Sequence, residues 1–364
     1  MADRKRIAIN TGGGDAPGLN AVIRAAVLSA TSRDWEVLGI CRGYEGLLDT
    51  HETKPLDNNS VRGLAHLGGT ILGTSNRGSP FEYPVNMGNG RIEVVDRSDE
   101  VVANFHQLGL DAMIAIGGDG SMEIAYKLSH KGMPIVGVPK TIDNDLEGTV
   151  VTFGFDTAVS VATEAIGRLH STAEAHERVF TIEVMGRYAG WIALFAGLAG
   201  GADVILMPEI PYRMDAVCDK IMRRQARGRR FSLVVVAEGA KPVGGKMTTK
   251  GEKELGREVQ LGGVGERIAR EIHEGTGKET RSVVLGHLQR GGSPSSYDRI
   301  LAARFGAAAV RVIAEDKSSV MVALDPPIVR TVPLEEATRR MKTVPLDGDV
   351  VHTAREMGIC LGDE

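Results

Sequence analysis

Two glycine-rich turns in the first half of the chain have the composition of phosphate-binding loops. Residues 11–18 read TGGGDAPG and residues 116–121 read IGGDGS, and each turn follows an apolar run. Small residues let backbone N–H groups point at an anion, and the N-terminus of a following helix adds a favourable dipole. Pro17 suits the first turn of such a helix, because it lacks an N–H that would be unsatisfied there. For the first motif alone, a tight turn capped by Asp15 is an equal alternative.

The second turn adds an acidic side chain. We expect Asp119 at the carboxyl end of a parallel strand, where open α/β sheets bind ligands. One or two carboxylates together with substrate phosphates commonly hold Mg²⁺, so Asp119 is a candidate metal ligand. The alternative is that Asp119 caps a helix that starts near Ser121. Two such turns on successive strands favour the functional interpretation.

A third motif, PKTIDND at residues 139–145, follows the next predicted strand. If this segment is extended, alternation places Thr141, Asp143 and Asp145 on one side of the chain. Two carboxylates beside a hydroxyl and the amine of Lys140 could supply a base, a metal ligand and a stabilising charge. Such a stretch is often plain turn chemistry. Its position one strand after the GGDG turn favours function.

Basic residues suited to phosphate binding lie in the second half of the chain. The planar guanidinium of arginine can bind a phosphate through two parallel hydrogen bonds. Each candidate lies at the end of a predicted strand or just beyond it, so we expect them to converge on one cleft. Glu238, at the end of another strand, could accept hydrogen bonds from sugar hydroxyls or be a solvated charge. The basic candidates are Arg178, Met185-Gly186-Arg187, Arg281 and His287-Leu288-Gln289-Arg290.

Short apolar runs alternate with longer amphipathic runs, which predicts βαβ units and an α/β fold with mostly parallel sheets. Val159, Ala162, Ile166 and Leu169, for example, recur at helical spacing. The predicted strands are 6–11, 37–41, 112–116, 135–138, 179–184, 203–207, 232–237 and 282–285, and the predicted helices are 19–29, 157–173, 264–273 and 300–314.

The overall composition narrows the class of protein. The chain has 364 residues and a formal net charge of −4, which fits two α/β lobes of roughly 100–200 residues and argues against nucleic acid or a membrane as the main partner. The most apolar stretch, residues 191–207, contains three glycines and Asp203, so we interpret it as a buried helix followed by a strand. Three widely spaced cysteines indicate a reducing, cytoplasmic location.

Taken in order, these motifs resemble the signatures of the phosphofructokinase family. GGDAPG, GGDGS, PKTIDND, MGR and GHLQRGGSP all match, over roughly residues 6–315. The resemblance implies two Rossmann-like lobes with the active site in the cleft between them. It also implies Mg²⁺ and transfer of a phosphoryl group to the 1-hydroxyl of fructose 6-phosphate. Residues 1–154 with about 289–340 would form the donor-binding lobe, and residues 155–288 with about 341–364 the fructose 6-phosphate lobe.

The resemblance assigns roles in phosphoryl transfer and in donor binding. Asp143 would be the base that takes the proton of the sugar hydroxyl, and Asp119 would bind Mg²⁺. Thr141, Lys140 and Arg187 would stabilise the phosphoryl group during transfer. The residues that would contact the ATP donor are Gly14, Arg77, Gly78, Gly118, Asp119, Gly120 and Ser121.

The resemblance also implies a sugar-phosphate site and an oligomer. Arg178 resembles the residue that members of the family lend to a neighbouring subunit, which predicts a homodimer or homotetramer. The residues that would hold the sugar phosphate are Thr141, Asp143, Arg178, Met185, Gly186, Arg187, Glu238, Arg281, His287 and Arg290.

Two positions differ between the ATP-dependent and the pyrophosphate-dependent members of the family, and in this sequence they point to different donors. Gly120 is the choice of nucleotide users, because the aspartate of pyrophosphate users would clash with an α-phosphate. Lys140 is the choice of pyrophosphate users. A clash with like charge excludes a ligand more strongly than an added lysine attracts one, so we expect ATP as the donor and keep pyrophosphate as the alternative. A GGDG-type nucleotide or lipid kinase, or a non-catalytic sugar-phosphate sensor, is a more distant alternative.

Overall fold

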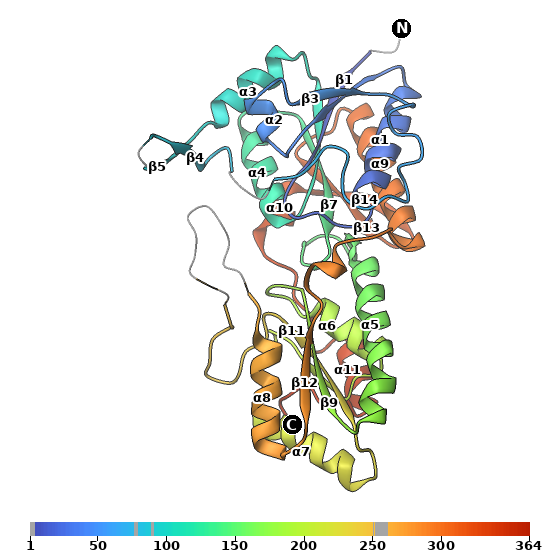
Figure 1. The fold of residues 1–364 in the computed structure, drawn as a ribbon. Coiled ribbons are helices and arrows are strands. Elements are labelled where there is room, and N and C mark those ends of the chain that lie inside the picture. Colours follow the sequence, from blue (N-terminus) through green and yellow to red (C-terminus); the bar gives the residue numbers. More distant parts are fainter. Residues whose placement is uncertain (1–3, 76–78, 89–90, 250, 252–260) are drawn as a thin grey trace.

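The secondary structure is arranged around two separate sheets (Figure 1). The computed structural model describes residues 4–75, 79–88, 91–249, 251 and 261–364. One sheet has eight strands and the other has four, and a small ribbon of two strands projects to the side of the first sheet. The ribbon consists of β4, Tyr83–Asn86, and β5, Ile92–Val95.

The first sheet is parallel at its centre and antiparallel at both edges. Its strand order is β14-β13-β7-β6-β1-β2-β3, and the short β8 pairs in parallel with the last residues of β7. The antiparallel pairs are β13 with β14 and β2 with β3. The strands are β1 Arg6–Thr11, β2 Glu36–Ile40, β3 Thr53–Leu56, β6 Ala112–Gly117, β7 Ile135–Thr141, β8 Phe153–Gly154, β13 Val320–Asp325 and β14 Ile328–Pro333.

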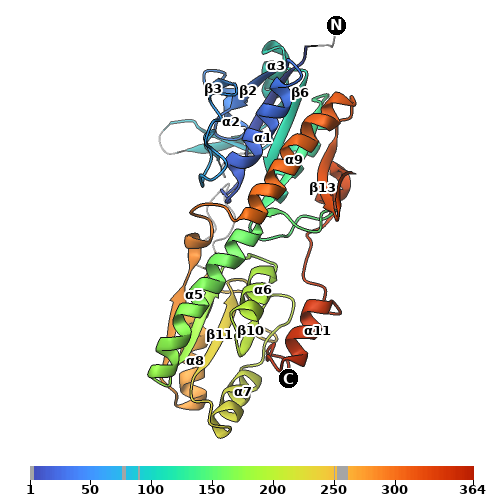
Figure 2. The same ribbon diagram turned by 90° about the vertical axis from the view of Figure 1, so that its right-hand side faces the viewer.

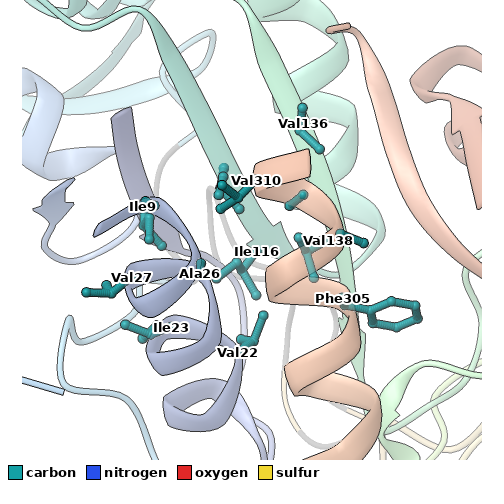
Figure 3. Packing of buried hydrophobic residues seen from close by; sticks show 14 of the residues in the cluster. Ile9, Val22, Ile23, Ala26, Val27, Ile116, Val136, Val138, Phe305 and Val310 are labelled. Carbon is teal, nitrogen blue, oxygen red and sulfur yellow. The ribbon is translucent and has the colours of Figure 1, made fainter. Parts of the chain in front are cut away.

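Helices cover both faces of the first sheet, which explains why its central strands are almost wholly apolar. Along β1, Ile7 and Ile9 pack on the face covered by α1 and α9, whereas Ala8 packs on the opposite face with α3 and α4. Figure 3 shows Ile9, Ile116 and Val138 of the sheet packed against α1 and α9. The helices are α1 Leu19–Thr31, α2 Glu45–Leu48, α3 Ser98–Gln107, α4 Asp119–His130, α9 Ser296–Ala314 and α10 Leu334–Arg339.

The second sheet is parallel throughout, with the strand order β10-β11-β9-β12. Helices α5, α6 and α11 pack on one face, and α7 and α8 pack on the other. The elements are α5 Phe155–Ala175, β9 Val179–Val184, α6 Trp191–Ala199, β10 Val204–Leu206, α7 Met214–Ala226, β11 Ser232–Ala237, α8 Val264–Thr276, β12 Thr280–Val284, the 3-10 turn η1 Gly286–Gln289 and α11 Asp349–Glu356.

The chain crosses between the two sheets at three places. The first crossing leads from β8 into α5, the second from η1 into α9, and the third from α10 to α11. The N-termini of α5 and α9 meet at the junction (Figure 2). There Asp298 accepts a hydrogen bond from the backbone N–H of Thr157 at 2.8 Å, and Asp156 accepts one from the hydroxyl of Ser295. Asp298 of α9 thus lies at the positive N-terminus of α5, and Asp156 of α5 lies at the positive N-terminus of α9.

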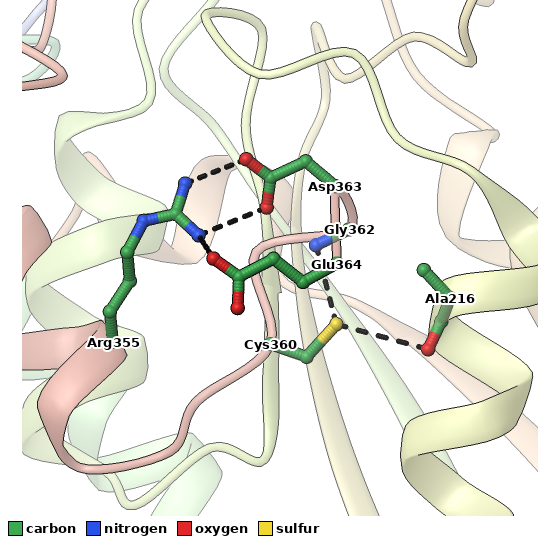
Figure 4. Close-up of polar contacts among 6 residues, drawn as sticks. All are labelled: Ala216, Arg355, Cys360, Gly362, Asp363 and Glu364. Atoms are coloured by element: carbon green, nitrogen blue, oxygen red, sulfur yellow. Dashed lines mark hydrogen bonds and ion pairs between the residues drawn. The ribbon is translucent and has the colours of Figure 1, made fainter.

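The C-terminal residues pack against the second sheet (Figure 4). Arg355 of α11 forms an ion pair with Asp363 at 2.6 Å and donates a second bond to Glu364. Cys360 joins the edge of the sheet, because it bridges Val204 of β10. The final residues therefore belong to the second sheet, although the last strand before them, β14, belongs to the first.

The structure confirms the expected α/β fold with mostly parallel sheets. The stretch at residues 191–207 is α6 followed by β10, as predicted. No helix in the described part of the chain is long and apolar enough to span a membrane. Pro17, however, lies before the helix it was expected to open, because α1 begins at Leu19 after a left-handed Gly18. The antiparallel strands β13 and β14 were not predicted.

Candidate active site

The two glycine-rich turns lie side by side at the carboxyl edge of the first sheet. Strands β1 and β6 are parallel neighbours, and the N–H of Gly12 donates to the carbonyl of Ile116 at 2.9 Å. Gly117 is required by packing, since a Cβ there would lie 2.2 Å from the Cβ of Ser121. Ser121 is buried against both turns. The backbones of the two turns therefore lie next to each other at the carboxyl edge of the first sheet.

Asp119 is the first residue of α4. The alternative interpretation was that Asp119 and Asp15 serve only as helix caps, and the structure shows neither of them in that position. The N-cap residues are Gly118 for α4 and Gly18 for α1, and neither helix has a side-chain cap. Asp119 and Gly120 are exposed at the start of α4. The Asp119 carboxylate is therefore available to a ligand at a helix N-terminus.

The acidic segment does not continue as an extended strand, which corrects one premise of the sequence argument. Strand β7 ends at Thr141, and Asn144 has a left-handed backbone with φ 53°. The chain turns so that the N–H of Asp143 donates to the Thr141 hydroxyl at 3.0 Å. Asp143 and Asp145 are still brought close to each other, but by this turn rather than by alternation.

Asp143 is a buried carboxyl that faces several charges. It is 4% exposed, and its Oδ1 has no hydrogen-bond partner among the described residues. Burial raises the pKa of Asp143, the guanidinium groups of Arg290 and Arg187 lower it, and the charge of Asp119 raises it again. The side chains at the edge of the first sheet therefore lie within electrostatic reach of two arginines from elsewhere in the chain.

Lys140 and Asp145 complete this buried group of charges. The ammonium of Lys140 donates to the carbonyl of Gly14, and burial together with Arg290 lowers the pKa of Lys140 to about 8. Burial and the charge of Asp143 raise the pKa of Asp145 to about 7. Perturbed pKa values of this kind are common at functional sites.

The MGR motif follows β9 and lies against the end of β11. Gly186 has φ 136°, and Arg187 has a left-handed φ of 49°. The N–H of Arg187 donates to Oε1 of Glu238 at 3.1 Å. A Cβ on Gly239 would lie 1.9 Å from the carbonyl oxygen of Arg187, so only glycine allows this approach. Burial raises the pKa of Glu238 to about 7.

The HLQRGG segment joins the second sheet to the first. His287 is exposed in η1, at the carboxyl end of β12. Arg290 follows η1 and donates to the carbonyl of Asp15 at 2.7 Å. A Cβ on Gly14 would lie 2.8 Å from Nη1 of Arg290. The Arg290 guanidinium therefore lies directly across the first glycine-rich turn.

Arg178 and Arg281 do not join this group, contrary to the expected convergence on one cleft. Arg178 precedes β9 and Arg281 pairs with Phe180 near its start, whereas Arg187 follows the other end of the same strand. Six residues of strand span roughly 20 Å. Both arginines instead bind Glu279, Arg178 at 2.9 Å. Arg281 also borders a surface hollow of about 310 Å³ lined by Ala269, Arg270, His273, Glu279, Thr280 and Arg281.

Two predicted site residues cannot be placed, and two residues of the site were not predicted. Arg77 and Gly78 lie outside the described residues. Asp145, with its raised pKa, was recognised in its motif but was not assigned to the site. Lys342 was missed altogether, although it donates to Asn144 Oδ1 at 2.9 Å. No local pattern around Lys342 marks it, because its partner is 198 positions away in the sequence.

Comparison with known proteins identifies relatives along the whole chain. A sequence model of the family described as phosphofructokinase matches residues 6–313. An ATP-dependent 6-phosphofructokinase of Chloroflexus aggregans is 52% identical, with 100% of both chains covered. A pyrophosphate–fructose 6-phosphate 1-phosphotransferase of Amycolatopsis methanolica is 50% identical, with 93% of this chain and 96% of that protein covered. Overall identity therefore does not separate the two donor types.

The fold is also shared with solved structures. The phosphofructokinase of Pichia pastoris in the T-state matches with a TM-score of 0.80 and 31% identity. The match covers 98% of this chain but 37% of the Pichia chain, so the present protein spans little more than a third of that length. Because the family model covers most of the residues, and the bacterial relatives match almost from end to end, the chain belongs to the phosphofructokinase family.

Proposed function

We propose that the protein is an ATP-dependent 6-phosphofructokinase, which transfers a phosphoryl group from ATP to the 1-hydroxyl of D-fructose 6-phosphate and yields fructose 1,6-bisphosphate. The observation that carries this proposal is the buried Asp143 carboxyl within electrostatic reach of Lys140, Arg187 and Arg290. A base beside several cations suits phosphoryl transfer, in which positioning and charge stabilisation dominate. The name of the full-length relative from Chloroflexus aggregans supports ATP as the donor.

Asp143 is the proposed base. A base works best when its pKa lies near the working pH, and burial raises the pKa of Asp143 toward that range. The hydroxyl of Thr141, which accepts from the Asp143 N–H at 3.0 Å, orients the carboxyl. Arg187 and Lys140 then supply positive charge where negative charge develops on the transferred group.

The glycine-rich turns and the start of α4 form the proposed donor site. Backbone N–H groups and the dipole of α4 favour the phosphates of ATP. The residues assigned to the donor are Gly14, Gly118, Asp119, Gly120 and Ser121, together with Arg77 and Gly78 beyond the described residues.

The residues at the donor site fit Mg²⁺ held jointly with the donor. In the described part of the chain, no group of three or more acidic, histidine or cysteine side chains could hold a metal ion alone. Mg²⁺ commonly takes one or two carboxylates and completes its shell with substrate phosphates and water. Asp119, exposed at the start of α4, offers such a carboxylate, so we propose it as the metal ligand. Bound there, Mg²⁺ would neutralise phosphate charge during transfer.

The loops at the carboxyl end of the second sheet form the proposed sugar site. Glu238 is held by the Arg187 N–H and presents an oxygen to sugar hydroxyls. Arg290 follows η1 and lies across the glycine-rich turn of the proposed donor site. The residues assigned to fructose 6-phosphate are Thr141, Asp143, Met185, Gly186, Arg187, Glu238, His287 and Arg290.

Arg178 and Arg281 are assigned to the site of a neighbouring subunit. They lie at the far end of the second sheet from Arg187, too far to serve the same bound sugar phosphate. A homodimer or homotetramer would bring this pair and its surface hollow against the sugar site of another chain.

The two sheets support the proposed division into lobes. The described residues within 1–154 and about 289–340 contain the strands and helices of the first sheet, and we assign this part to the donor lobe. The described residues within 155–288 and about 341–364 contain those of the second sheet, and we assign this part to the sugar lobe. All three cysteines are free thiols, which agrees with the proposed cytoplasmic location.

ATP is preferred over pyrophosphate because of the space at Gly120. A Cβ there would meet no atom within 4 Å, so the start of α4 is open for a nucleotide. Lys140 favours the alternative, a pyrophosphate-dependent enzyme like the relative from Amycolatopsis methanolica. The two activities differ in one measurable property, the donor used.

Initial rates with ATP and with pyrophosphate, at equal Mg²⁺ and saturating fructose 6-phosphate, test the proposal. We expect turnover with ATP at least about tenfold faster than with pyrophosphate, and a loss of the ATP rate in Gly120→Asp, where a carboxylate would repel the α-phosphate. Turnover with pyrophosphate alone would overturn the choice of donor. Turnover with neither donor would overturn the reaction itself.

A further inference from the structure

The third crossing between the sheets contacts the loop that carries the proposed base. This segment, residues 340–344, leads from α10 to α11, and we call it the C-terminal strap. The backbone N–H of Lys342 donates to the carbonyl of Asp145 at 2.8 Å, and Met341 forms a β-bridge with Leu146. The strap therefore lies directly along the chain that follows Asp143.

The Lys342 ammonium closes this loop from the inside. It donates to Oδ1 of Asn144 at 2.9 Å, to the carbonyl of Thr149 at 3.0 Å and to the carbonyl of Val150 at 2.9 Å. A lysine has three N–H donors, and all three are used here. Oδ1 of Asn144 also accepts from the N–H of Thr152 at 3.1 Å. One cation thus joins the two ends of the loop at residues 144–152.

The same strap is attached to the loop that bears Arg187. The indole N–H of Trp191 donates to the carbonyl of Lys342 at 3.2 Å, and the Lys342 ammonium lies 5.4 Å from the centre of the Trp191 ring. The N–H of Val344 donates to Glu209 at 2.9 Å, and Glu209 also accepts from the N–H of Gly190. Gly190 and Trp191 follow Arg187 by only three and four residues. Both sides of the proposed active site therefore meet at the strap.

We propose that Lys342 is a positioning residue, which fixes the Asp143–Asp145 loop and keeps it in register with the Arg187 loop during phosphoryl transfer. The inference rests on the proposed 6-phosphofructokinase activity. Asn144, the direct partner of the ammonium, has a left-handed backbone, which is uncommon for a residue other than glycine although asparagine adopts it more readily than most. If the loop relaxes, the Asp143 carboxyl moves relative to the sugar hydroxyl while the residues that bind the sugar stay in place. The consequence is a slower chemical step with little change in binding.

The first test compares Lys342→Met with Arg340→Met. Methionine keeps most of the apolar stem and removes the three donors. We expect kcat to fall by about 10–100-fold, since small misplacements of reacting groups have effects of this size, while the KM values for fructose 6-phosphate and ATP stay within about threefold. Arg340 lies two residues away in the same strap and forms an exposed pair with Glu147 at 3.1 Å. Its replacement should leave both constants within about twofold.

A second test asks whether Lys342 acts through Asn144. If it does, the double variant Lys342→Met with Asn144→Ala should be no slower than the slower single variant, because coupled residues are not additive. Lys342→Arg, which keeps the charge and several donors, should recover part of the lost kcat. Independent, multiplicative losses would overturn the proposal. A kcat within twofold of the wild type in Lys342→Met would also overturn the proposal, as would an increase in KM in place of the fall in kcat. Loss of cooperative thermal unfolding in this variant would overturn it too, because that result would assign Lys342 to stability. An inactive wild type would instead reject the proposed function.

Discussion

Two groups of ionic side chains lie at opposite ends of β9 and differ in almost every physical respect. The buried cluster consists of the buried Lys140, Asp143 and Asp145 together with the half-buried Arg187 and Arg290, around the carboxyl end of the strand. The exposed cluster consists of the exposed Glu279 and Arg281 together with the half-buried Arg178, at the start of the strand. In the buried cluster, burial is the largest cause of the raised pKa values of Asp143 and Asp145. In the exposed cluster, the hydrogen bond from Arg178 lowers the pKa of Glu279.

The difference shows what each cluster can do within a single chain. Charges held away from water interact strongly and shift one another's protonation, which is a requirement for acid–base chemistry. Exposed pairs are screened and contribute about 0–1 kcal/mol. The buried cluster is therefore organised for chemistry as it stands. The exposed cluster would gain strength only when another surface covers it.

The largest effect is expected from the centre of the buried cluster. Asp143→Asn keeps the shape of the side chain but cannot accept the hydroxyl proton, so kcat should fall by about 10²–10⁴-fold. Binding of fructose 6-phosphate, measured by calorimetry, should change by less than about threefold. A variant with near-normal turnover would remove Asp143 from the role of base and would end the distinction between the two clusters.

A substitution in the exposed cluster is expected to have a smaller effect, and to change KM rather than kcat. Arg281→Met should raise KM for fructose 6-phosphate by about 10–100-fold, the value of one charge-assisted hydrogen bond to a phosphate, with kcat within about threefold of wild type. Arg230→Met is the matched control, because Arg230 forms an exposed pair with Glu177 on the same side of the sheet. It should leave KM unchanged.

Mixing the two variants tests whether the clusters serve different chains. In a hybrid of Asp143→Asn and Arg281→Met subunits, one site combines the intact Asp143 of one chain with the intact Arg281 of the other. Mixtures refolded together should therefore recover activity at low fructose 6-phosphate that neither variant shows alone. Absence of recovery in a mixture shown to contain hybrids would place Arg281 outside the neighbouring site.

The sequence was sufficient to predict Lys140, Asp143, Arg187 and Arg290 of the buried cluster, but not the part of Asp145 in it or how its members are held. Strands β1, β9 and β11 match the predicted ranges because continuous apolar runs mark strands buried on both faces. The turns that follow such strands must lie at one edge, which brings Asp119 and Asp143 together. The contact between Asn144 and Lys342 was not predictable, because the two residues lie 198 positions apart in the sequence.

The same reasoning failed for the exposed cluster for a geometrical reason. Arg178 and Arg187 flank one predicted strand, and the basic candidates were expected to converge because each lies near the end of a strand, without regard to which end. A strand of six residues separates its ends by roughly 20 Å, so two arginines at its ends cannot bind one phosphate. Strands β13 and β14 were missed because the motifs end before them, although Met321 and Ala323 alternate with Val322 between the two faces of the sheet.

The smallest effect is expected from Glu279, the acid that binds both exposed arginines. Glu279→Gln removes a competing carboxylate and leaves the guanidinium groups of Arg178 and Arg281 free to bind a phosphate. Because exposed ion pairs are weak, KM for fructose 6-phosphate should fall by no more than about fivefold. The decrease should fade as the salt concentration rises, since screening weakens exposed charges. Initial rates at several salt concentrations measure both effects. A higher KM in Glu279→Gln would contradict this account, because it would mean that Glu279 orients the arginines rather than competing for them.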